Sequence, residues 1–323
     1  MNRAAIIALS FAAGMAACAA ASAAPMIGIV EETVQGDFAH RTRADVRLGF
    51  LKTDIGWAAI GCNASPKAGP QQWNGLAMTC EHFADPDRPR VWQVTAGGNN
   101  LGEITTRGWL DTGYYSYAGA LRIVSGGVPF AGARDKNFSG WTGAPVHHPL
   151  VAVSPGLPPA GKRWIEDKPR SNLRDALWPQ FHKFIPKIEV CKARKDAEPL
   201  SETRASRKSD LEVLNGLRSQ SGEMLLHLRV NPAFSNDCDG TLGWQMEMWF
   251  YRAADGRLRV LPGQFADRNW TNPSTVLTPV DLGAYAGDGS EQAVFFLSAY
   301  NLDGYVLYYD HFTKFARVTW SYH

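Results

Sequence analysis

The feature that most constrains the fold is the stretch from Asp281 to His323, which reads almost without a break as a three-stranded meander. In its first strand, apolar residues fill both alternating sets, with Ala293, Phe295, Leu297 and Ala299 on one side and Val294, Phe296 and Tyr300 on the other. Successive side chains of a strand point to opposite faces, so we expect both faces of this strand to be covered. The run from Asn301 to Gly304 is interpreted as a turn into a second strand over residues 305–309.

The third strand of this meander alternates more cleanly. One set is Ala316, Val318, Trp320 and Tyr322, and the other is Arg317, Thr319 and Ser321. An alternation of apolar and polar residues is typical of an antiparallel strand with one buried and one solvated face. We therefore expect a half-buried final strand.

Shorter candidate strands precede this meander along the chain. In the stretch from Asp45 to Leu51, three apolar residues are predicted to share one side, Val46, Leu48 and Phe50. Further strands are predicted over residues 57–62, 73–80, 91–95, 101–106, 223–230 and 243–252. The run from Pro155 to Gly161 is rich in proline and glycine and is interpreted as a linker.

One helix is predicted, from Ser171 to Phe184, with Ser171 as its cap. Its apolar face is expected to hold Leu173, Ala176, Leu177, Phe181 and Phe184. Because Pro179 lies in the middle, the helix is expected to be kinked or to form two short turns. The charged stretch from Lys192 to Lys208 holds no periodic apolar residues and is interpreted as a solvated loop, with a basic docking surface as the alternative.

These patterns predict a mainly β fold with two β-rich domains of hairpins and meanders, sandwich- or propeller-blade-like, and one short helical segment near 171–185. The predicted segments are a signal peptide over 1–23, an N-terminal domain over 24–154, a linker and helix over 155–186, and a C-terminal domain over 187–323.

Propeller blades are considered because Asp-Gly pairs recur. Asp239-Gly240 and Asp255-Gly256 are followed roughly 48 residues later by Asp288-Gly289 and Asp303-Gly304. The run near Asp288 resembles a blade of the FG-GAP type, but Gly283 and Ala284 stand where that family has its dense aspartate loop. A plain meander is the preferred interpretation, because two units are fewer than a propeller requires.

The N-terminus has the layout of a secretory signal peptide. Arg3 precedes an apolar run from Ala4 to Ala17, and small residues around Ala23 offer a cleavage site. The alternative of a membrane anchor is disfavoured because the alanine-rich run is short and mildly apolar. No later stretch is long and apolar enough to span a bilayer, so we expect no integral membrane span in the mature chain.

Five cysteines occur in the chain. The run Met15-Ala-Ala-Cys18 resembles the end of a lipoprotein signal, which makes a lipidated Cys18 an alternative to simple periplasmic or secreted localisation. The other four, in an exported chain, predict disulfides: Cys62, Cys80, Cys191 and Cys238. Of the three possible pairings, Cys62–Cys80 with Cys191–Cys238 is preferred, because each bridge then stays within one half of the chain.

The charge balance and the motifs limit the possible functions. The net charge of +2 is close to neutral and gives no reason to expect nucleic acid as a partner. No catalytic or nucleotide-binding motif is present, and no cofactor is expected. His147 and His148 are adjacent in an extended segment, so they should face opposite ways, one buried and one exposed.

Two acidic groups are candidate cation sites. Asn236-Asp-Cys-Asp-Gly240 offers several oxygen side chains, and Asp281, Asp288 and Glu291 form a second group. Both are interpreted as turns, because the spaced ligands of a calcium loop are missing. We therefore predict no metal site.

The chain has 11 tryptophans, and flat aromatic faces on a β scaffold are suited to gripping sugars. Trp249 and Tyr251, predicted on the outer side of their strand beside Glu247, are the candidate binding residues. Trp57, Trp73 and Trp92 form a second candidate cluster. The alternative is that these rings fill the space between sheets.

We therefore expect an exported, bacterial-type envelope protein that is non-catalytic, of binding or structural character, with a glycan or an envelope protein as partner. The alternative is a hydrolase of an envelope polysaccharide or peptidoglycan, with a carboxylate pair drawn from Asp237, Asp239 and Glu247.

Overall fold

The computed structural model describes residues 24–34, 42–61, 76–77, 89–110, 120–128, 130, 135–139, 145–155, 164–167, 173–184, 187–194, 197–230, 246–264, 276–299 and 302–321. These residues form antiparallel sheets and one α-helix, so the prediction of a mainly β fold is confirmed. Several predicted features lie outside them: the signal peptide, Cys62, Cys80, Ser171 and the run 236–240 with Cys238. For Cys191 only the backbone is described.

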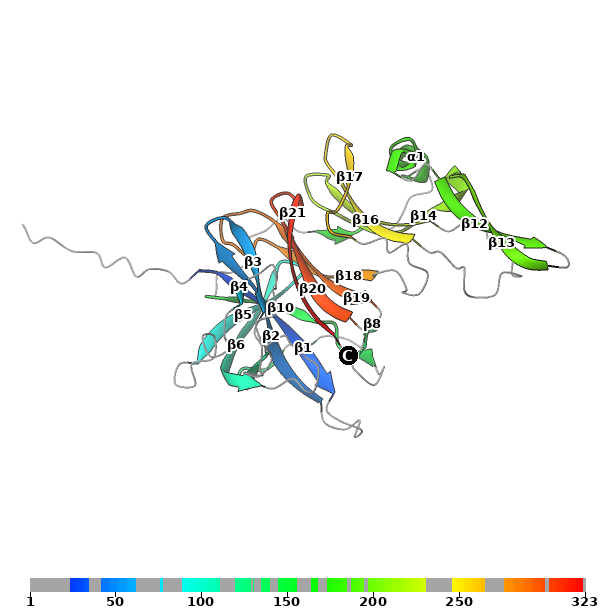
Figure 1. Cartoon of the computed structure of the whole chain (residues 1–323). Coiled ribbons are helices and arrows are strands. Elements are labelled where there is room, and N and C mark those ends of the chain that lie inside the picture. Colours follow the sequence, from blue (N-terminus) through cyan, green and yellow to red (C-terminus); the bar gives the residue numbers. More distant parts are fainter. Residues whose placement is uncertain are drawn as a thin grey trace, which may run out of the picture.

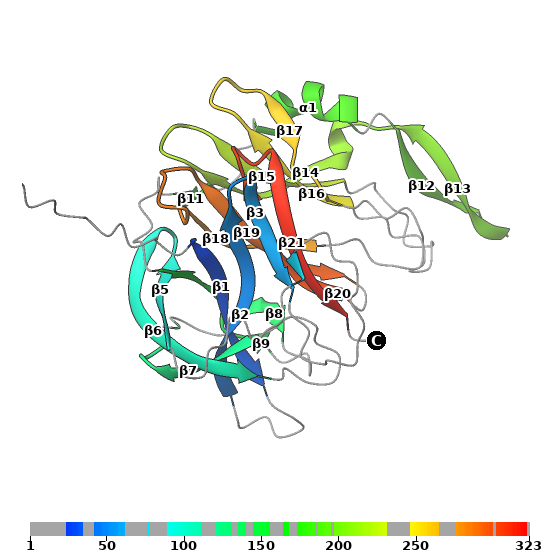
Figure 2. The same ribbon diagram turned by 60° about the vertical axis from the view of Figure 1, so that its left-hand side comes forward.

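Six strands close into an antiparallel barrel (Figures 1 and 2). Around the ring they are β1 (Met26–Val34), β10 (Leu150–Ser154), β5 (Arg90–Ala96), β6 (Asn99–Leu110), β7 (Ala120–Ser125) and β2 (Thr42–Thr53). The ring closes because β1 pairs with both β10 and β2. From β2 the sheet continues into β3 (Gly56–Gly61) and β4 (Leu76–Ala77), and a separate pair is formed by β8 (Asp135–Ser139) and β9 (Pro145–Val146).

Side chains from all six strands fill the barrel, among them Val30, Leu48, Trp92, Ile104, Leu121 and Ala152. Trp92 is completely buried, and its indole N–H donates to Thr106 Oγ1 at 2.8 Å. A Cβ on Gly28 would lie 2.5 Å from Val46 Cγ1, so the backbone of β1 lies close to the side chains inside the barrel at this position. A closed six-stranded barrel is narrow, and this one has a packed core.

The prediction that Val46, Leu48 and Phe50 share one side is wrong for Phe50. Gly28 pairs with Leu48 whereas Ile27 pairs with Phe50, so one residue of β2, Gly49, is left over as a bulge. The extra residue reverses the alternation. The Phe50 side chain therefore points out of the barrel and packs in the core between the barrel and sheet F.

The C-terminal residues form a four-stranded sheet, named sheet F here. Its strands are, in order, β18 (Val276–Gly283), β19 (Gln292–Ala299), β20 (Leu302–Tyr309) and β21 (Lys314–Ser321). One face packs on the outside of the barrel through Val294, Tyr305, Leu307 and Val318. The other face packs on a further sheet through Ala293, Phe295, Val306 and Tyr308. Both faces of β19 are thus covered, as predicted.

The further sheet, named sheet D here, has five strands. They are β11 (Ile165–Glu166), β14 (Leu211–Arg218), β15 (Met224–Val230), β16 (Met246–Arg252) and β17 (Leu258–Val260). One face meets sheet F, and the other is covered by α1 (Leu173–Phe184). The order of layers is therefore barrel, sheet F, sheet D and helix (Figure 1).

The contact between the barrel and sheet F joins the N-terminal and C-terminal parts of the chain. Residues of the N-terminal part, such as Ile27 and Val151, share one hydrophobic core with Val294 and Val318 of sheet F. Polar contacts reinforce it, since the Tyr305 hydroxyl donates to Glu31 Oε1 at 2.6 Å and the Arg47 guanidinium lies 4.0 Å from the Trp320 ring centroid. The sheets stack as layers, which matches the sandwich-like alternative better than propeller blades.

Two local predictions need correction. In α1, Leu177 and Phe181 are buried as predicted, but Ala176 is exposed, and the helix continues through Pro179 without dividing into two turns. The charged stretch 192–208 is not a loop. It forms most of a hairpin, β12 (Lys187–Arg194) and β13 (Ala197–Ala205), followed by a short 3-10 helix at Lys208–Asp210.

The hairpin escaped prediction because it projects away from the packed layers (Figures 1 and 2). Apolar periodicity marks residues that face a core, and a projecting ribbon has little core to face. At its base, Arg204 binds the Asp210 carboxylate through two nitrogens at 2.7 and 2.8 Å. Burial opposes ionisation of Asp210, but the hydrogen bonds from Arg204 and from the Arg207 backbone prevail and hold its pKa below the ordinary value.

Gly304 is also not the turn residue that was predicted. It lies inside β20 opposite Leu297, and a Cβ on it would lie 2.4 Å from the Val318 carbonyl oxygen and 2.8 Å from Thr319 Cγ2. We expect Gly304→Ala to lower the free energy of unfolding by about 1–3 kcal/mol, because the neighbouring backbone must move. Chemical denaturation measures this. Gly127→Ala is the control, since nothing lies within 4 Å of its Cβ position, and an equal effect of both would contradict the close-approach explanation.

Candidate functional site

The face of sheet D that meets sheet F changes from apolar to polar across three rows of paired residues. The first row, Leu217–Leu225–Tyr251, lies in the core against sheet F. The second row is Asn215–His227–Trp249, and the third is Glu212–Arg229–Glu247. Directly paired residues share a face, so the second and third rows continue the same surface outward. We name the five polar residues Glu212, Asn215, His227, Arg229 and Glu247 the Glu247 surface.

Glu247 is the centre of the hydrogen bonding on this surface. Its Oε1 accepts from Arg229 Nε at 2.7 Å, and its Oε2 lies 3.1 Å from His227 Nε2. The hydrogen bond with His227 lowers the pKa of Glu247, burial opposes this, and Arg229 lowers it further, so that the pKa lies below its ordinary value of 4.5. The carboxylate is therefore an ionised hydrogen-bond acceptor at neutral pH.

Along the third row, side-chain exposure increases from β16 to β14. The Glu247 side chain is 13% exposed, Arg229 is 27% exposed and Glu212 is 49% exposed. Glu212 Oε2 lies 3.6 Å from Arg229 Nη1, an ion pair longer than a hydrogen bond. Asn215 is exposed as well. The surface thus offers carboxylate, guanidinium and amide groups to solvent on paired strands, with the His227 imidazole buried beside them.

Trp249 supports this surface from below and does not present a face to solvent. It is 2% exposed, it stacks against His227 with 4.7 Å between ring centroids, and its N–H donates to the Leu277 carbonyl at 2.8 Å. Phe295 of sheet F lies edge-on against the indole at 5.1 Å. The expectation that this side of β16 faces outward is wrong, because sheet F covers it.

Tyr251 is buried in the same way, at 6% exposure. Its hydroxyl donates to Glu223, and the Arg259 guanidinium lies 4.4 Å from its ring centroid. Burial, followed by the nearby Glu223, raises the pKa of Tyr251 above its ordinary range. Like Trp249, Tyr251 packs between sheets, and sugar stacking by either ring stays a prediction without an exposed ring face to support it. Of the second tryptophan cluster, Trp57 and Trp92 are buried in the separate cores outside and inside the barrel, and Trp73 lies outside the described residues.

Both histidines of the adjacent pair are hydrogen-bonded and partly buried, so the prediction of one buried and one exposed ring is wrong. His147 Nδ1 lies 2.8 Å from Glu32 Oε2, and the ring stacks on Phe130. His148 lies between Asp135 Oδ2 at 3.2 Å and the Val280 carbonyl at 2.9 Å. The two rings have separate partners, as expected for neighbours in an extended segment.

The second acidic group was interpreted as turns, which is wrong for Asp281, because this residue lies within β18. Asp281 is buried between layers, where it accepts from Thr95 Oγ1 at 2.7 Å and from the Gly97 amide at 2.5 Å. Burial raises the pKa of Asp281, although the hydrogen bond from Thr95 opposes the rise. Asp288 lies in a turn, as predicted, and accepts from the Ser290 amide at 2.9 Å.

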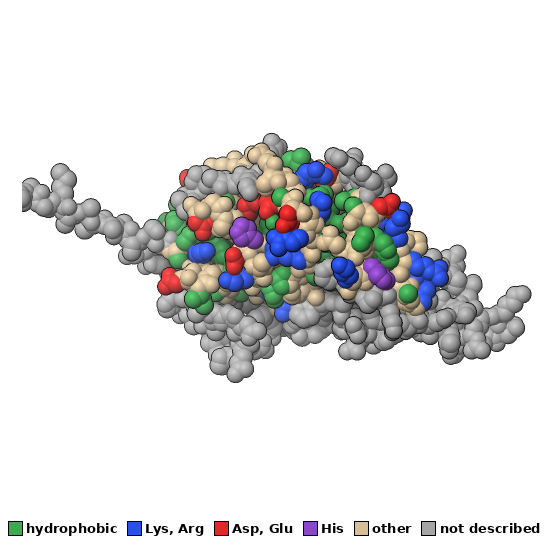
Figure 3. Space-filling view, turned by 90° about the horizontal axis from the view of Figure 1, so that it is seen from above, with side chains coloured by type: hydrophobic (Ala, Val, Ile, Leu, Met, Phe, Trp, Pro, Cys, Tyr) green, Lys and Arg blue, Asp and Glu red, His purple; other side chains and the backbone are tan. Residues whose placement is uncertain are grey.

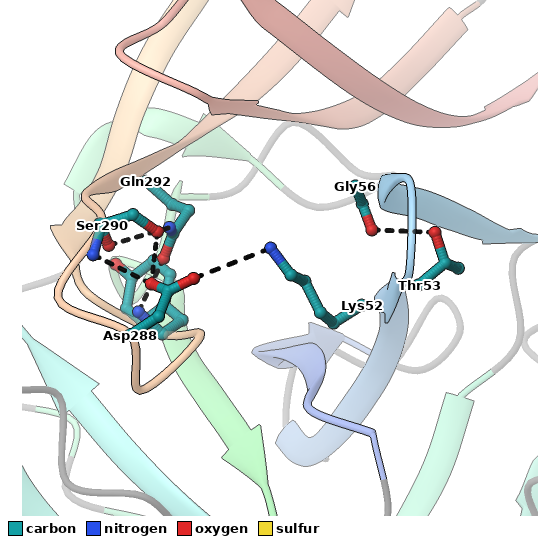
Figure 4. Close-up of polar contacts among 7 residues, drawn as sticks. Lys52, Thr53, Gly56, Asp288, Ser290 and Gln292 are labelled. Atoms are coloured by element: carbon teal, nitrogen blue, oxygen red, sulfur yellow. Dashed lines mark hydrogen bonds and ion pairs between the residues drawn. The ribbon is translucent and has the colours of Figure 1, made fainter.

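Asp288 also contacts the barrel. Its carboxylate lies 3.8 Å from Lys52 Nζ, next to the hydrogen bonds that Ser290 makes with Gln292 (Figure 4). Within the part of the chain that the structure describes, no cluster of three or more His, Cys, Asp or Glu side chains could hold a metal ion. The candidate loop at 236–240 lies outside those residues.

Sequence reasoning found Glu247 but missed the residues that surround it. His227 and Arg229 lie on a strand that was predicted, and their alternate spacing places them on one face. The pairing of Arg229 with both Glu212 and Glu247 depends on the register of three strands, which the sequence alone does not reveal.

No protein-family model matches this chain, and comparisons with curated proteins and with solved structures find no significant match. Among the described residues, no helix has the length and apolar character needed to cross a membrane. Figure 3 shows acidic and basic side chains interspersed on one face of the molecule, in keeping with the net charge of +2.

The low pKa of Glu247 predicts how the free energy of unfolding depends on pH. A carboxylate with a depressed pKa in the folded state stabilises the fold above its unfolded pKa, and this stabilisation is lost as the pH falls through the folded value. We expect the free energy of unfolding of wild type to decrease below about pH 4.5 more steeply than that of Glu247→Gln. Urea denaturation at several pH values measures this. The exposed Glu103→Gln should keep the wild-type profile, and identical profiles for all three proteins would contradict the assignment.

Proposed function

We propose that the protein is an exported, non-catalytic binding protein of the bacterial envelope that holds a glycan on the Glu247 surface. The observation that carries the proposal is the ionised Glu247 carboxylate, fixed between His227 and Arg229 on paired strands of sheet D. Carboxylate, guanidinium and amide groups are the donors and acceptors that sugar hydroxyls require. Trp249, buried beneath His227, keeps this arrangement rigid.

Export and two disulfide bridges are part of the same proposal. The apolar run after Arg3 and the small residues near Ala23 support a cleaved signal peptide, with a periplasmic or secreted product or a lipoprotein attached through Cys18. Four remaining cysteines support two bridges. The intact mass of the exported protein tests both points, since reduction of two bridges adds about four hydrogens. An uncleaved N-terminus or an unchanged mass would contradict this part.

A hydrolase of an envelope polymer is the second candidate. Its support is the third row of paired residues, in which Arg229 lies between the two carboxylates Glu212 and Glu247. Glycoside hydrolysis needs one carboxyl group that keeps its proton and acts as the general acid. Glu247 does not suit that role, because His227 and Arg229 hold its pKa low. Asp237 and Asp239 lie outside the described residues.

The proposal is tested by adding soluble oligosaccharides and peptidoglycan fragments to the purified protein, first in a thermal-shift screen and then by calorimetric titration. A ligand that binds the folded state raises the melting temperature. We expect Glu247→Gln to weaken binding roughly tenfold, because a hydrogen bond to a charged group is lost. Glu103→Gln on the barrel is the matched control and should bind like wild type. Equal affinity of Glu247→Gln and wild type, or release of products from the bound polymer, would contradict the proposal.

A further inference from the structure

The third row of the Glu247 surface, Glu212–Arg229–Glu247, holds more negative than positive charge. Two carboxylates, Glu212 and Glu247, share the single guanidinium of Arg229. His227 does not alter this at Glu212, because its Nε2 lies 3.1 Å from Glu247 Oε2, so any positive charge on the ring lies against Glu247. Arg229 can neutralise only one of the two carboxylates.

The distances show which carboxylate Arg229 serves. Its Nε lies 2.7 Å from Glu247 Oε1 and its Nη2 contacts the same oxygen, whereas its closest approach to Glu212 is 3.6 Å. The contact of Arg229 with Glu247 is a strong, charge-assisted hydrogen bond, whereas its pair with Glu212 is a loose ion pair. Glu212 is therefore the carboxylate left with capacity for another cation, and its side chain is half exposed at the open edge of the surface.

We infer that the glycan held on the Glu247 surface contains an amino sugar whose free ammonium group pairs with Glu212. This rests on the function proposed above and adds the chemical class of the ligand. An ammonium group is compact and donates three hydrogen bonds, so it can reach a carboxylate at the edge of a surface without displacing Arg229. Asn215 is exposed on the same strand as Glu212, so its amide is available to hydroxyls of the same sugar, and Glu247 lies two strands away on the same face.

Calorimetric titration with a glucosamine tetrasaccharide and with its fully N-acetylated counterpart tests the inference on the full-length exported protein. The two probes share one sugar backbone and differ at the amino groups, which are cationic ammonium groups in the first and neutral acetamides in the second. We expect wild type to bind the amine form about fivefold more tightly at low salt, a preference of the size that a partly exposed ion pair supplies. The preference should shrink at high salt, because ions screen exposed charges.

Glu212→Gln should remove the preference by weakening the binding of the amine form, and the control Glu103→Gln should retain the preference. Equal affinity of wild type for the two probes would overturn the inference, as would a preference that survives in Glu212→Gln. Binding of the acetylated form that depends on Glu247 would leave the proposed function standing in that case. If neither probe nor any other glycan binds, the proposed function fails together with the inference.

Discussion

Replacing Trp249 with alanine is expected to lower the free energy of unfolding by about 3–5 kcal/mol, the range for truncating a large buried aromatic residue. The indole is 2% exposed and packs between His227 and Phe295. Its loss leaves a cavity at the junction of sheets D and F and removes the donor to the Leu277 carbonyl. Chemical denaturation, followed by tryptophan fluorescence and circular dichroism, measures the change.

Two further variants make this result specific. Val276→Ala changes the residue next to Leu277, but its side chain is 37% exposed, so an effect of about 0.5 kcal/mol is expected. Trp249→Phe keeps most of the apolar volume and loses the N–H, so it should fall between wild type and alanine. If Trp249→Ala were as stable as Val276→Ala, the indole would not be a core residue and sugar stacking by its ring would regain support.

Replacing Trp92 with alanine is expected to cost a similar amount, about 3–5 kcal/mol, in the barrel instead of between the sheets. Trp92 is the largest side chain in the barrel filling, and it also satisfies Thr106 through a hydrogen bond of 2.8 Å. The matched control is Val91→Ala on the same strand, since Val91 faces outward and is 46% exposed. A loss at Trp92 no larger than that at Val91 would contradict a packed barrel interior.

The sequence predicted the middle layer of the fold well, because both faces of β19 are covered over residues 293–297. The apolar residues at 293–297 alternate between two cores without a polar interruption, which is the pattern of a strand buried on both sides. The half-solvated β21 was equally clear. Barrel closure was not predictable, since it depends on the pairing of β1 with β10, which joins segments more than a hundred residues apart.

Local errors had identifiable physical causes. A bulge at Gly49 reverses the alternation of β2, and a period-two pattern cannot reveal the extra residue. The hairpin of β12 and β13 lies away from the packed layers, so its sequence lacks the apolar period of a core strand. Trp249 and Tyr251 were expected on the outer side of their strand, which is wrong, because sheet F covers that side and the sequence does not reveal the position of sheet F.

Sheet F is the shared middle layer that joins the barrel to sheet D and positions the Glu247 surface at the edge of their contact. Native-state hydrogen exchange tests this most directly. The amides of β19 and β20 should exchange only through global unfolding, because both faces of these strands are covered. Exchange in β19 and β20 that is as fast as in the barrel strands β6 and β7, which have exposed outer residues, would contradict it.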